Sequence, residues 1–305
     1  EAQLVELRPD GSLSENPSRE SPSSENPGGI QVFFFSIDLT LEKPALIETL
    51  KLLESESLEW VQGPGAGVDH PIWSQILERG ARLTNASGIH SEPIAQYIFS
   101  YLLHWERQVA RHQAQQIARE WKLLLSGDLT AKTLGIVGLG GIGSATARIA
   151  KAFGMRVLGL RRSDSRDPNV DRHHSPDELH ELLRESDYIV LCLPLTQETR
   201  RLIGSRELES MRDDAVLINV ARGGVVDESA LIDALEKRRI RGATLDVTEI
   251  EPLPKDSPLW SLENCVLTPH DAGYSPLAGE RLGQLFLENL RLYKDGATLR
   301  NEVRS

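Results

Sequence analysis

Residues 133–269 alternate between short apolar runs and helix-like stretches, and this alternation constrains the fold more than any other feature of the sequence. Strands are expected at 133–138, 156–161, 188–193, 215–219, 242–247 and 265–269, and helices at 142–153, 176–186, 206–211 and 227–238. Nearly continuous apolar strands separated by helices are typical of a parallel sheet that is covered on both faces. Six such strands predict a doubly wound α/β domain.

A glycine-rich loop joins the first of these strands to its helix. The sequence GLGGIG at 138–143 fits the pattern G-x-G-x-x-G. The first glycine permits a tight turn, the second lets the backbone approach a pyrophosphate, and the third lets the helix pack closely on the strand. The N-terminus of the helix offers N–H groups to phosphate. We therefore predict a dinucleotide site that is contacted by Gly138, Gly140, Gly141, Ile142 and Gly143.

Two arginines follow the second strand, at the position where an acidic side chain commonly binds the ribose. An acidic group there would repel a 2′-phosphate, whereas Arg161 and Arg162 can pair with it. Together with Ser163, they predict that NADP(H) is the preferred cofactor. The alternative is that both arginines lie exposed in solvent and that NAD(H) is used as well.

Three polar side chains each come just past a later strand: Arg222, Glu251 and His270. Open α/β sheets bind ligands at the carboxyl ends of their strands. A histidine can transfer a proton near neutral pH, and a neighbouring carboxylate favours its charged form. An arginine can bind a substrate carboxylate and polarise a carbonyl oxygen. The three residues predict reversible oxidation of a 2-hydroxy acid, with His270 as the acid and base.

The rest of the chain predicts a second, smaller α/β unit. Strands are expected at 30–36, 58–62 and 81–85, helices at 43–55 and 71–80, and a loop at the Ser- and Pro-rich segment 11–29. A long amphipathic segment runs from Pro93 to about Arg119, and the helical run 279–296 is expected to pack back on the first domain. We expect a substrate domain at 1–92 plus 275–305 and a dinucleotide-binding domain at 93–274.

The composition argues against several classes of partner. The formal net charge of −11 argues against binding to nucleic acid or to an anionic membrane. The sequence has no apolar run of 18 residues or more and no signal-peptide pattern at its start, so we expect a cytoplasmic protein. Cys192 and Cys265 are expected to be buried free thiols.

Other conspicuous side chains carry no sequence signal for catalysis or metal binding. The adjacent His173 and His174 lack the spacing of metal ligands and are expected in a solvated loop, so no metal site is predicted. Trp121 is expected to pack against the fold or to line a cleft.

The chain resembles the D-isomer-specific 2-hydroxyacid dehydrogenases from about residue 30 to about residue 300. The resemblance is carried by LTAKTLGIVGLGGIG, LPLTQETRRLIG, INVARGGVVDESAL, LDVTEIEPLP and LTPHDAG. The arginines after the second strand are similar to those of the glyoxylate/hydroxypyruvate reductase-like branch. Gln96 and Ala131 depart from the usual glutamate and glycine. The family normally has a strand and a helix before the segment at 2–7, so residues upstream are expected to be missing.

The resemblance implies a Rossmann cofactor domain, a flavodoxin-like substrate domain, and NAD(P)H-dependent reduction of small 2-keto acids to D-2-hydroxy acids. It implies that Asp246 holds the nicotinamide carboxamide and that the protein is a homodimer through the cofactor domain. The implied cofactor contacts, besides the loop and the arginines, are Leu193, Pro194, Thr199, Val220, Ala221, Asp246, His270 and Gly273. The implied substrate contacts are the backbone N–H groups of Ala66, Gly67 and Val68, with Arg222 and His270.

Two alternatives to a 2-keto acid reductase stay open. The first is a nucleotide-sensing interaction protein on the same scaffold, which would bind NAD(P)H without turnover. The second is a dehydrogenase of a different small acid, such as formate or phosphite. The intact trio of Arg222, Glu251 and His270 favours the reductase over both.

Overall fold

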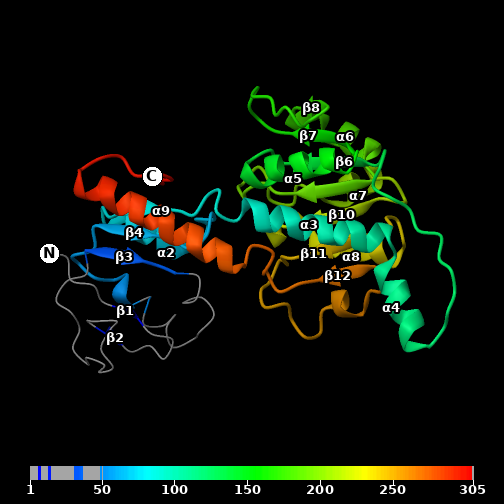
Figure 1. Cartoon of the computed structure of the whole chain (residues 1–305), viewed down its shortest axis with the longest axis horizontal. Helices are drawn as coiled ribbons and strands as arrows, with labels where there is room; N and C mark the ends of the chain where they lie inside the picture. Colours follow the sequence, from blue (N-terminus) through cyan, green and yellow to red (C-terminus); the bar gives the residue numbers. More distant parts are fainter. Residues whose placement is uncertain (1–5, 8–12, 15–30, 37–48, 50, 304–305) are drawn as a thin grey trace. The chain divides into compact units, whose positions relative to one another are not determined.

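The chain forms two compact units, one made of Glu1–His90 with Ser275–Ser305 and the other of Ser91–Tyr274 (Figure 1). The computed structural model describes residues 6–7, 13–14, 31–36, 49 and 51–303. Within these described residues, no helix is both long enough and apolar enough to cross a membrane.

The second unit contains a seven-stranded, fully parallel sheet. Its strands are β6 (Thr133–Val137), β7 (Arg156–Leu160), β8 (Arg172–His174), β9 (Tyr188–Leu191), β10 (Val216–Asn219), β11 (Gly242–Leu245) and β12 (Cys265–Leu267). They lie in the order β12-β11-β10-β9-β6-β7-β8. Because β6 pairs with β9 although β7 and β8 come between them in the sequence, the sheet is wound outward in two directions from this pair. The predicted doubly wound α/β fold is confirmed.

Helices cover both faces of this sheet. They are α3 (Ser91–Glu106), α5 (Gly141–Ala152), α6 (Leu179–Glu185), α7 (Ser205–Ser210) and α8 (Glu228–Glu236). Successive residues of a strand point to opposite faces, and β7 shows this directly. Val157 packs in a core with residues of α3 and α5 such as Phe99, whereas Leu158 packs with Leu182 of α6 and Leu235 of α8. Both faces are therefore apolar, which explains why the strands read as continuous hydrophobic runs.

The long amphipathic segment expected from Pro93 to about Arg119 forms two helices and not one. It forms α3 and then α4 (Val109–Ile117), separated at Gln108, whose φ of 52° is left-handed. The side chain of Gln108 donates to the carbonyl oxygen of Leu125 at 2.7 Å. No residue of α4 is buried, so no packed face continues the line of α3. Trp121, which follows α4, is fully exposed, and the expectation that it packs against the fold is wrong.

The strand β8 was not predicted, and one of its histidines is not the solvated loop residue that the sequence suggested. His174 is 2% exposed, and its carbonyl oxygen accepts from the backbone N–H of Arg161 at 3.2 Å. Its neighbour His173 accepts a hydrogen bond at Nε2 from the N–H of Asp167 at 3.0 Å. The sequence signal was weak because Arg172, His173 and His174 form a short strand without apolar residues.

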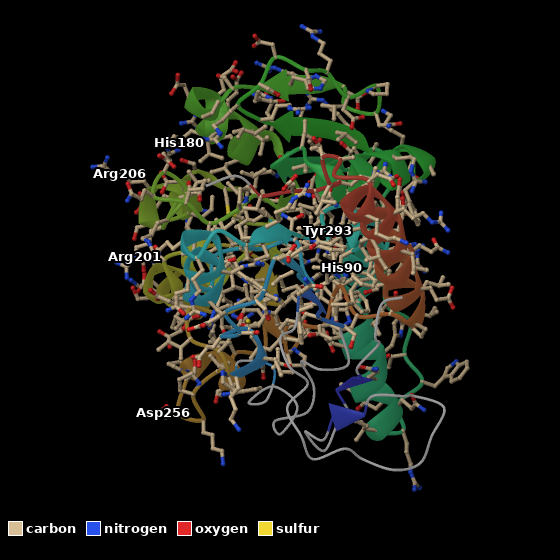
Figure 2. The ribbon with its side chains drawn as sticks, turned by 90° about the vertical axis from the view of Figure 1, so that its left-hand side faces the viewer. His90, His180, Arg201, Arg206, Asp256 and Tyr293 are labelled. Carbon is tan, nitrogen blue, oxygen red and sulfur yellow. The ribbon has the colours of Figure 1, made fainter. Side chains whose placement is uncertain are left out.

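The first unit has a three-stranded parallel sheet in the order β3 (Val32–Phe34), β4 (Trp60–Gln62) and β5 (Arg82–Thr84), with helices α2 (Pro71–Glu78) and α9 (Pro276–Lys294). Phe286 of α9 stacks on Phe34 and on Trp60, with ring centroids 4.5 and 5.3 Å apart. Tyr293, labelled in Figure 2, also stacks on Trp60. The predicted return of the C-terminal helix to the first domain is confirmed.

Two N-terminal expectations fall largely outside the described residues. Most of the loop at 11–29 and of the helix at 43–55 is not described. Within that loop, β2 (Leu13–Ser14) pairs antiparallel with β1 (Glu6–Leu7), so this short part is a strand.

Candidate functional site

The site residues predicted in the second unit lie in the segments that follow strands of the parallel sheet. Because the strands are parallel, their carboxyl ends share one edge of the sheet, and these residues gather there. Taken in the order of the strands in the sheet, His270 and Gly273 follow β12, Asp246 and Glu251 follow β11, and Val220, Ala221 and Arg222 follow β10. Next, Leu193, Pro194 and Thr199 follow β9, the glycine loop follows β6, and Arg161, Arg162 and Ser163 follow β7.

The glycine loop has the geometry of a phosphate cradle. Gly138 has a φ of 106°, and an added Cβ would lie 2.8 Å from the carbonyl oxygen of Cys192. A Cβ on Gly143 would lie 2.1 Å from the carbonyl oxygen of Gly138, so both positions require glycine for packing. Gly140 differs, because a Cβ there would have no neighbour within 4 Å among the described residues. Gly140 precedes α5 as its N-cap, where N–H groups face outward. This open space at the helix N-terminus fits a pyrophosphate.

Cys192 sits beside the same loop as an unreactive thiol. Its Sγ donates to the carbonyl oxygen of Gly138 at 2.9 Å, and burial raises its pKa to about 12. Cys192 and Cys265 are both free and only partly buried. Cys192 therefore supports the turn at Gly138 and is not a nucleophile at neutral pH.

His270 and Glu251 form a hydrogen-bonded pair. Nδ1 of His270 lies 2.8 Å from Oε2 of Glu251, and the two side chains are 45% and 38% exposed. The other carboxylate oxygen, Oε1, accepts from the N–H of Thr248 at 3.1 Å, which holds Glu251 in place. His270 has a φ of 58°, a left-handed conformation that non-glycine residues seldom adopt outside special sites. Because Nδ1 is bonded to Glu251, Nε2 is the nitrogen left to meet a substrate.

Each side chain of this pair shifts the pKa of the other. The hydrogen bond to Glu251 raises the pKa of His270 above its ordinary value, and the charge of Glu251 adds to this effect against burial and Arg222. Burial alone would raise the pKa of Glu251, but the hydrogen bond and the charge of His270 lower it. The arrangement therefore favours an imidazolium next to a carboxylate, which is a general acid ready to donate.

Asp246 anchors the loop that carries His270. It is 4% exposed, and its Oδ1 accepts from Thr268 Oγ1 at 2.7 Å and from the N–H of Asp271 at 3.0 Å. The N–H of Ala272 reaches both carboxylate oxygens at 3.2 Å. The N–H of His270 donates to the carbonyl oxygen of Asp246 at 2.8 Å. These bonds fix the turn after β12, and the expected contact of Asp246 with a carboxamide stays a prediction.

Arg222 is positioned by a buried asparagine. Asn219, the last residue of β10, is 1% exposed; its Nδ2 donates to the carbonyl oxygen of Arg222 at 3.0 Å, and its Oδ1 accepts from the N–H of Ala221 at 3.0 Å. Arg222 itself donates from Nη1 to the carbonyl oxygen of Ala221 at 2.7 Å. It is close enough to lower the pKa of both His270 and Glu251.

The arginines after β7 lie at the surface. Arg161 is partly buried, while Arg162 and Ser163 are exposed. Among the described residues, no carboxylate oxygen lies within 4.0 Å of either guanidinium. Arg162 contributes to the lowered pKa of Glu198, after the larger effect of the hydrogen bond from Thr196.

The expected substrate loop belongs to the first unit. The carbonyl oxygen of Pro64 accepts from Nε2 of His90 at 3.0 Å; Figure 2 labels this histidine. The carbonyl oxygen of Gly65 accepts from the N–H of Ala86 at 2.8 Å, and that of Ala66 accepts from Nδ2 of Asn85 at 3.1 Å. Within the described part of the chain, no acceptor is bonded to the N–H groups of Ala66, Gly67 or Val68. The carbonyl oxygens of this loop are therefore hydrogen-bonded within the first unit, while the three successive N–H groups of residues 66–68 stay available for an anion.

Three positioning residues were missed by the sequence reasoning: Asn219, Thr268 and Tyr97. Tyr97 of α3 donates to Thr268 Oγ1 at 2.6 Å, and Thr268 donates in turn to Asp246. Asn219 could have been found, because an asparagine at a strand end commonly accepts from a backbone N–H two residues on. Tyr97 had no local signal, since its partner is far away in the sequence.

The comparisons with known proteins agree on one family. Residues 99–272 match the family described as D-isomer specific 2-hydroxyacid dehydrogenase, NAD binding domain. The chain is 41% identical over 241 residues to a glyoxylate reductase of Korarchaeum cryptofilum, covering 75% of this chain and 71% of that protein.

Solved structures give the same result. A D-isomer specific 2-hydroxyacid dehydrogenase family protein of Aeromonas salmonicida superposes with a TM-score of 0.79 at 33% identity, covering 90% of this chain and 85% of the other. The NADPH-dependent glyoxylate/hydroxypyruvate reductase of Sinorhizobium meliloti, in complex with NADP and sulfate, has a TM-score of 0.77 at 26% identity and coverages of 94% and 88%.

Proposed function

Because this chain belongs to the D-isomer-specific 2-hydroxyacid dehydrogenase family, we propose that it reduces small 2-keto acids through His270, Glu251 and Arg222. It is an NAD(P)-dependent oxidoreductase of the glyoxylate reductase-like branch. The observation that carries the proposal is the contact of 2.8 Å between His270 and Glu251, at the sheet edge that also carries the glycine loop.

The proton in this reaction comes from His270. A nicotinamide nucleotide held at the glycine loop would supply a hydride for C2 of the keto acid. His270 donates the Nε2 proton to the C2 oxygen, and Glu251 keeps hold of Nδ1 throughout, so the ring stays oriented. Arg222 pairs with the substrate carboxylate and draws electron density from the keto oxygen. The reverse reaction uses neutral His270 as the base.

The open space at Gly140 supports binding of a nicotinamide nucleotide, because a pyrophosphate there needs close approach of the backbone. Leu193, Pro194, Thr199, Val220, Ala221, Asp246 and Gly273 would line the rest of the nucleotide. We propose NADP(H) as the preferred form. Arg161 and Arg162 have no competing carboxylate within ion-pair distance among the described residues, and together with Ser163 they can bind a 2′-phosphate.

A small 2-keto acid presents a carboxylate, and the free N–H groups of Ala66, Gly67 and Val68 suit this anion. Glyoxylate and hydroxypyruvate carry only a hydrogen or a small substituent on the carbonyl carbon, so the site would have little else of the substrate to accommodate. Val68 is 37% exposed and is the one of these residues whose side chain can discriminate among substrates.

We further propose that two copies associate through the cofactor domain. Trp121, Leu123 and Leu125 form an apolar strip after α4 with exposed fractions of 101%, 100% and 99%. A contiguous strip of large apolar side chains is unusual on a monomer, and a second copy of the chain would cover it.

The free thiols Cys192 and Cys265 support a reducing compartment such as the cytoplasm.

Initial rates with glyoxylate, hydroxypyruvate, pyruvate and phenylpyruvate, each with NADPH and with NADH, test this function. We expect turnover of the smallest acids and an NADPH preference of about tenfold or more, equivalent to about 1.4 kcal/mol. His270→Ala should abolish turnover while nucleotide binding persists. Nucleotide binding without turnover of any acid by the folded wild-type protein would favour the nucleotide-sensing alternative instead.

A further inference from the structure

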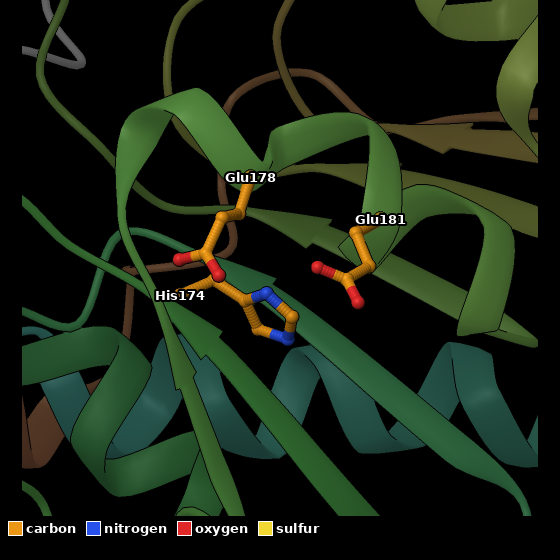
Figure 3. Close-up of side chains that lie close together, drawn as sticks. All are labelled: His174, Glu178 and Glu181. Atoms are coloured by element: carbon orange, nitrogen blue, oxygen red, sulfur yellow. The ribbon is translucent and has the colours of Figure 1, made fainter.

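The edge strand β8 and helix α6 bring a histidine and two glutamates together outside the catalytic set. His174 ends β8, Glu178 ends the 3₁₀ turn Pro176–Glu178, and Glu181 lies in the first turn of α6. One potential ligand atom from each side chain lies within 4.8 Å of the other two. Figure 3 shows both carboxylates directed toward the imidazole ring.

The imidazole of His174 is unusual because it is buried without a partner. The residue is 2% exposed, and neither Nδ1 nor Nε2 has a hydrogen-bond partner in the described part of the chain. Native proteins rarely leave a buried polar group unsatisfied, and each exception calls for a ligand, an ion or a water. The carbonyl oxygen of His174 accepts from the N–H of Arg161, whereas the two ring nitrogens have no partner among the described residues.

Glu178 has one carboxylate oxygen engaged by the backbone and the other open to a ligand. Burial is the main cause that lowers the pKa of His174, and the charge of Arg172 adds to it. The backbone N–H of Ser175 donates to Oε2 of Glu178 at 2.7 Å and lowers the pKa of that carboxyl. This bond engages Oε2, while Oε1 of Glu178 can turn to a ligand. Neutral imidazole and ionised carboxylate are the ligand forms.

We propose that His174, Glu178 and Glu181 bind a divalent transition-metal ion of the zinc class. One imidazole nitrogen and two carboxylate oxygens form a donor set that suits Zn²⁺, with water as the fourth ligand of a tetrahedron. All three ligands lie within residues 174–181, so binding closes only short loops.

The ion competes with one existing contact. Arg172 donates from Nη2 to Oε1 of Glu181 at 2.8 Å and from Nη1 to Oε1 of Glu185 at 3.1 Å. When Glu181 turns to the metal, Arg172 keeps Glu185 as its partner. The ion then joins the end of β8 to α6. Since β8 and β12 are opposite edges of the sheet, the ion is a structural link and takes no part in proton transfer at His270.

The test is a titration of the full-length protein, first stripped with a chelator, with Zn²⁺ in calorimetry and with Co²⁺ by visible absorption. We expect one equivalent to bind, with a visible Co²⁺ band and a higher Tm. His174→Gln and Glu181→Gln should each weaken Zn²⁺ binding about tenfold or more, which is about 1.4 kcal/mol. Circular dichroism checks that each variant is folded, and Glu181→Gln decides the matter if His174→Gln does not fold.

Two matched controls locate the ion. Like Glu181→Gln, Glu185→Gln removes one negative charge from α6 and one carboxylate partner of Arg172, but it should leave the Zn²⁺ affinity unchanged. His173→Gln, which changes the histidine next to His174, should also leave it unchanged. Absence of Zn²⁺ binding to the wild type would overturn the proposal. So would an affinity that is unchanged in both His174→Gln and Glu181→Gln, or one that is lost only in His270→Gln, because the ion would then sit at the catalytic pair.

Discussion

At the residue scale, one carboxylate sets the pH at which His270 can donate its proton. Glu251 raises the pKa of His270, while Arg222 lowers it and Asp246 raises it. Protonated His270 is present below this raised pKa, so the reductive kcat/KM should fall as the pH rises through it. In Glu251→Gln the hydrogen bond can persist but the charge is lost, so the falling limb should move to lower pH, and kcat should drop about 10²-fold or more.

The measurement is the pH profile of reductive kcat/KM for wild type and Glu251→Gln at saturating nucleotide. Glu249→Gln is the control, because Glu249 is a nearby exposed carboxylate without contact to His270. A profile of Glu251→Gln that superposes on the wild type would show that Glu251 does not hold the proton on His270.

In the glycine loop, two glycine-to-alanine substitutions can separate an effect on nucleotide binding from an effect on packing. Gly140→Ala adds a methyl group that meets no atom within 4 Å among the described residues, so stability should change little. The same methyl group would occupy the space for pyrophosphate, and the Kd for NADPH should rise about tenfold or more. Gly143→Ala meets the carbonyl oxygen of Gly138 at 2.1 Å and should lower the unfolding free energy by about 1–3 kcal/mol. Thermal unfolding and fluorescence titration with NADPH distinguish the two, and unchanged NADPH affinity in Gly140→Ala would contradict the proposed cradle.

At the scale of elements, we expect the segment that follows β7 to decide which nucleotide is preferred. In the double variant Arg161→Ser with Arg162→Ser, the KM for NADPH should rise about a hundredfold or more, because two charge-assisted hydrogen bonds are lost and each contributes about 1.5–3 kcal/mol. The KM for NADH should stay nearly constant. Arg206→Ser, which removes an exposed arginine of α7 outside this segment, is the matched control. Equal changes in both KM values would mean that the arginines support the loop and do not read the 2′-phosphate.

Elements were predictable where an apolar pattern marked them and were missed where it did not. The strands β6, β7, β9, β10 and β11 are buried on both faces, and their apolar runs identified them. The short edge strand β8 reads as Arg172, His173 and His174, and its pairing with β7 depends on a neighbour that the local sequence does not reveal. The break at Gln108 was missed for the same reason, since its side chain is held by the distant Leu125.

The candidate site was more predictable than the contacts that support it. Arg222, Glu251 and His270 follow strand ends, and parallel strands necessarily bring those ends to one edge. The supporting contacts involve residues far apart in sequence, such as Tyr97 with Thr268. The partnerless ring of His174 also became visible only with the fold, because burial of this ring depends on β8 joining the sheet.

At the scale of the whole molecule, the strip of Trp121, Leu123 and Leu125 predicts association of two copies. The three side chains are almost completely exposed in the single chain. Burying them in an interface removes apolar surface from water, which contributes a favourable free energy of about 25 cal/mol per Å². Light scattering after size-exclusion chromatography should give twice the mass of one chain for the wild type. Trp121→Ser with Leu123→Ser should shift the protein to the mass of one chain.

Leu277→Ser on α9 is the control for general surface polarity. Leu277 is 56% exposed and belongs to the first unit, so this change should leave the mass at that of two chains. Nucleotide binding by the monomeric variant should persist, because the glycine loop and the arginines after β7 all come from one copy of the sheet. A wild-type mass of one chain at micromolar concentration would contradict the dimer, and it would leave the exposed strip to be covered by a different partner.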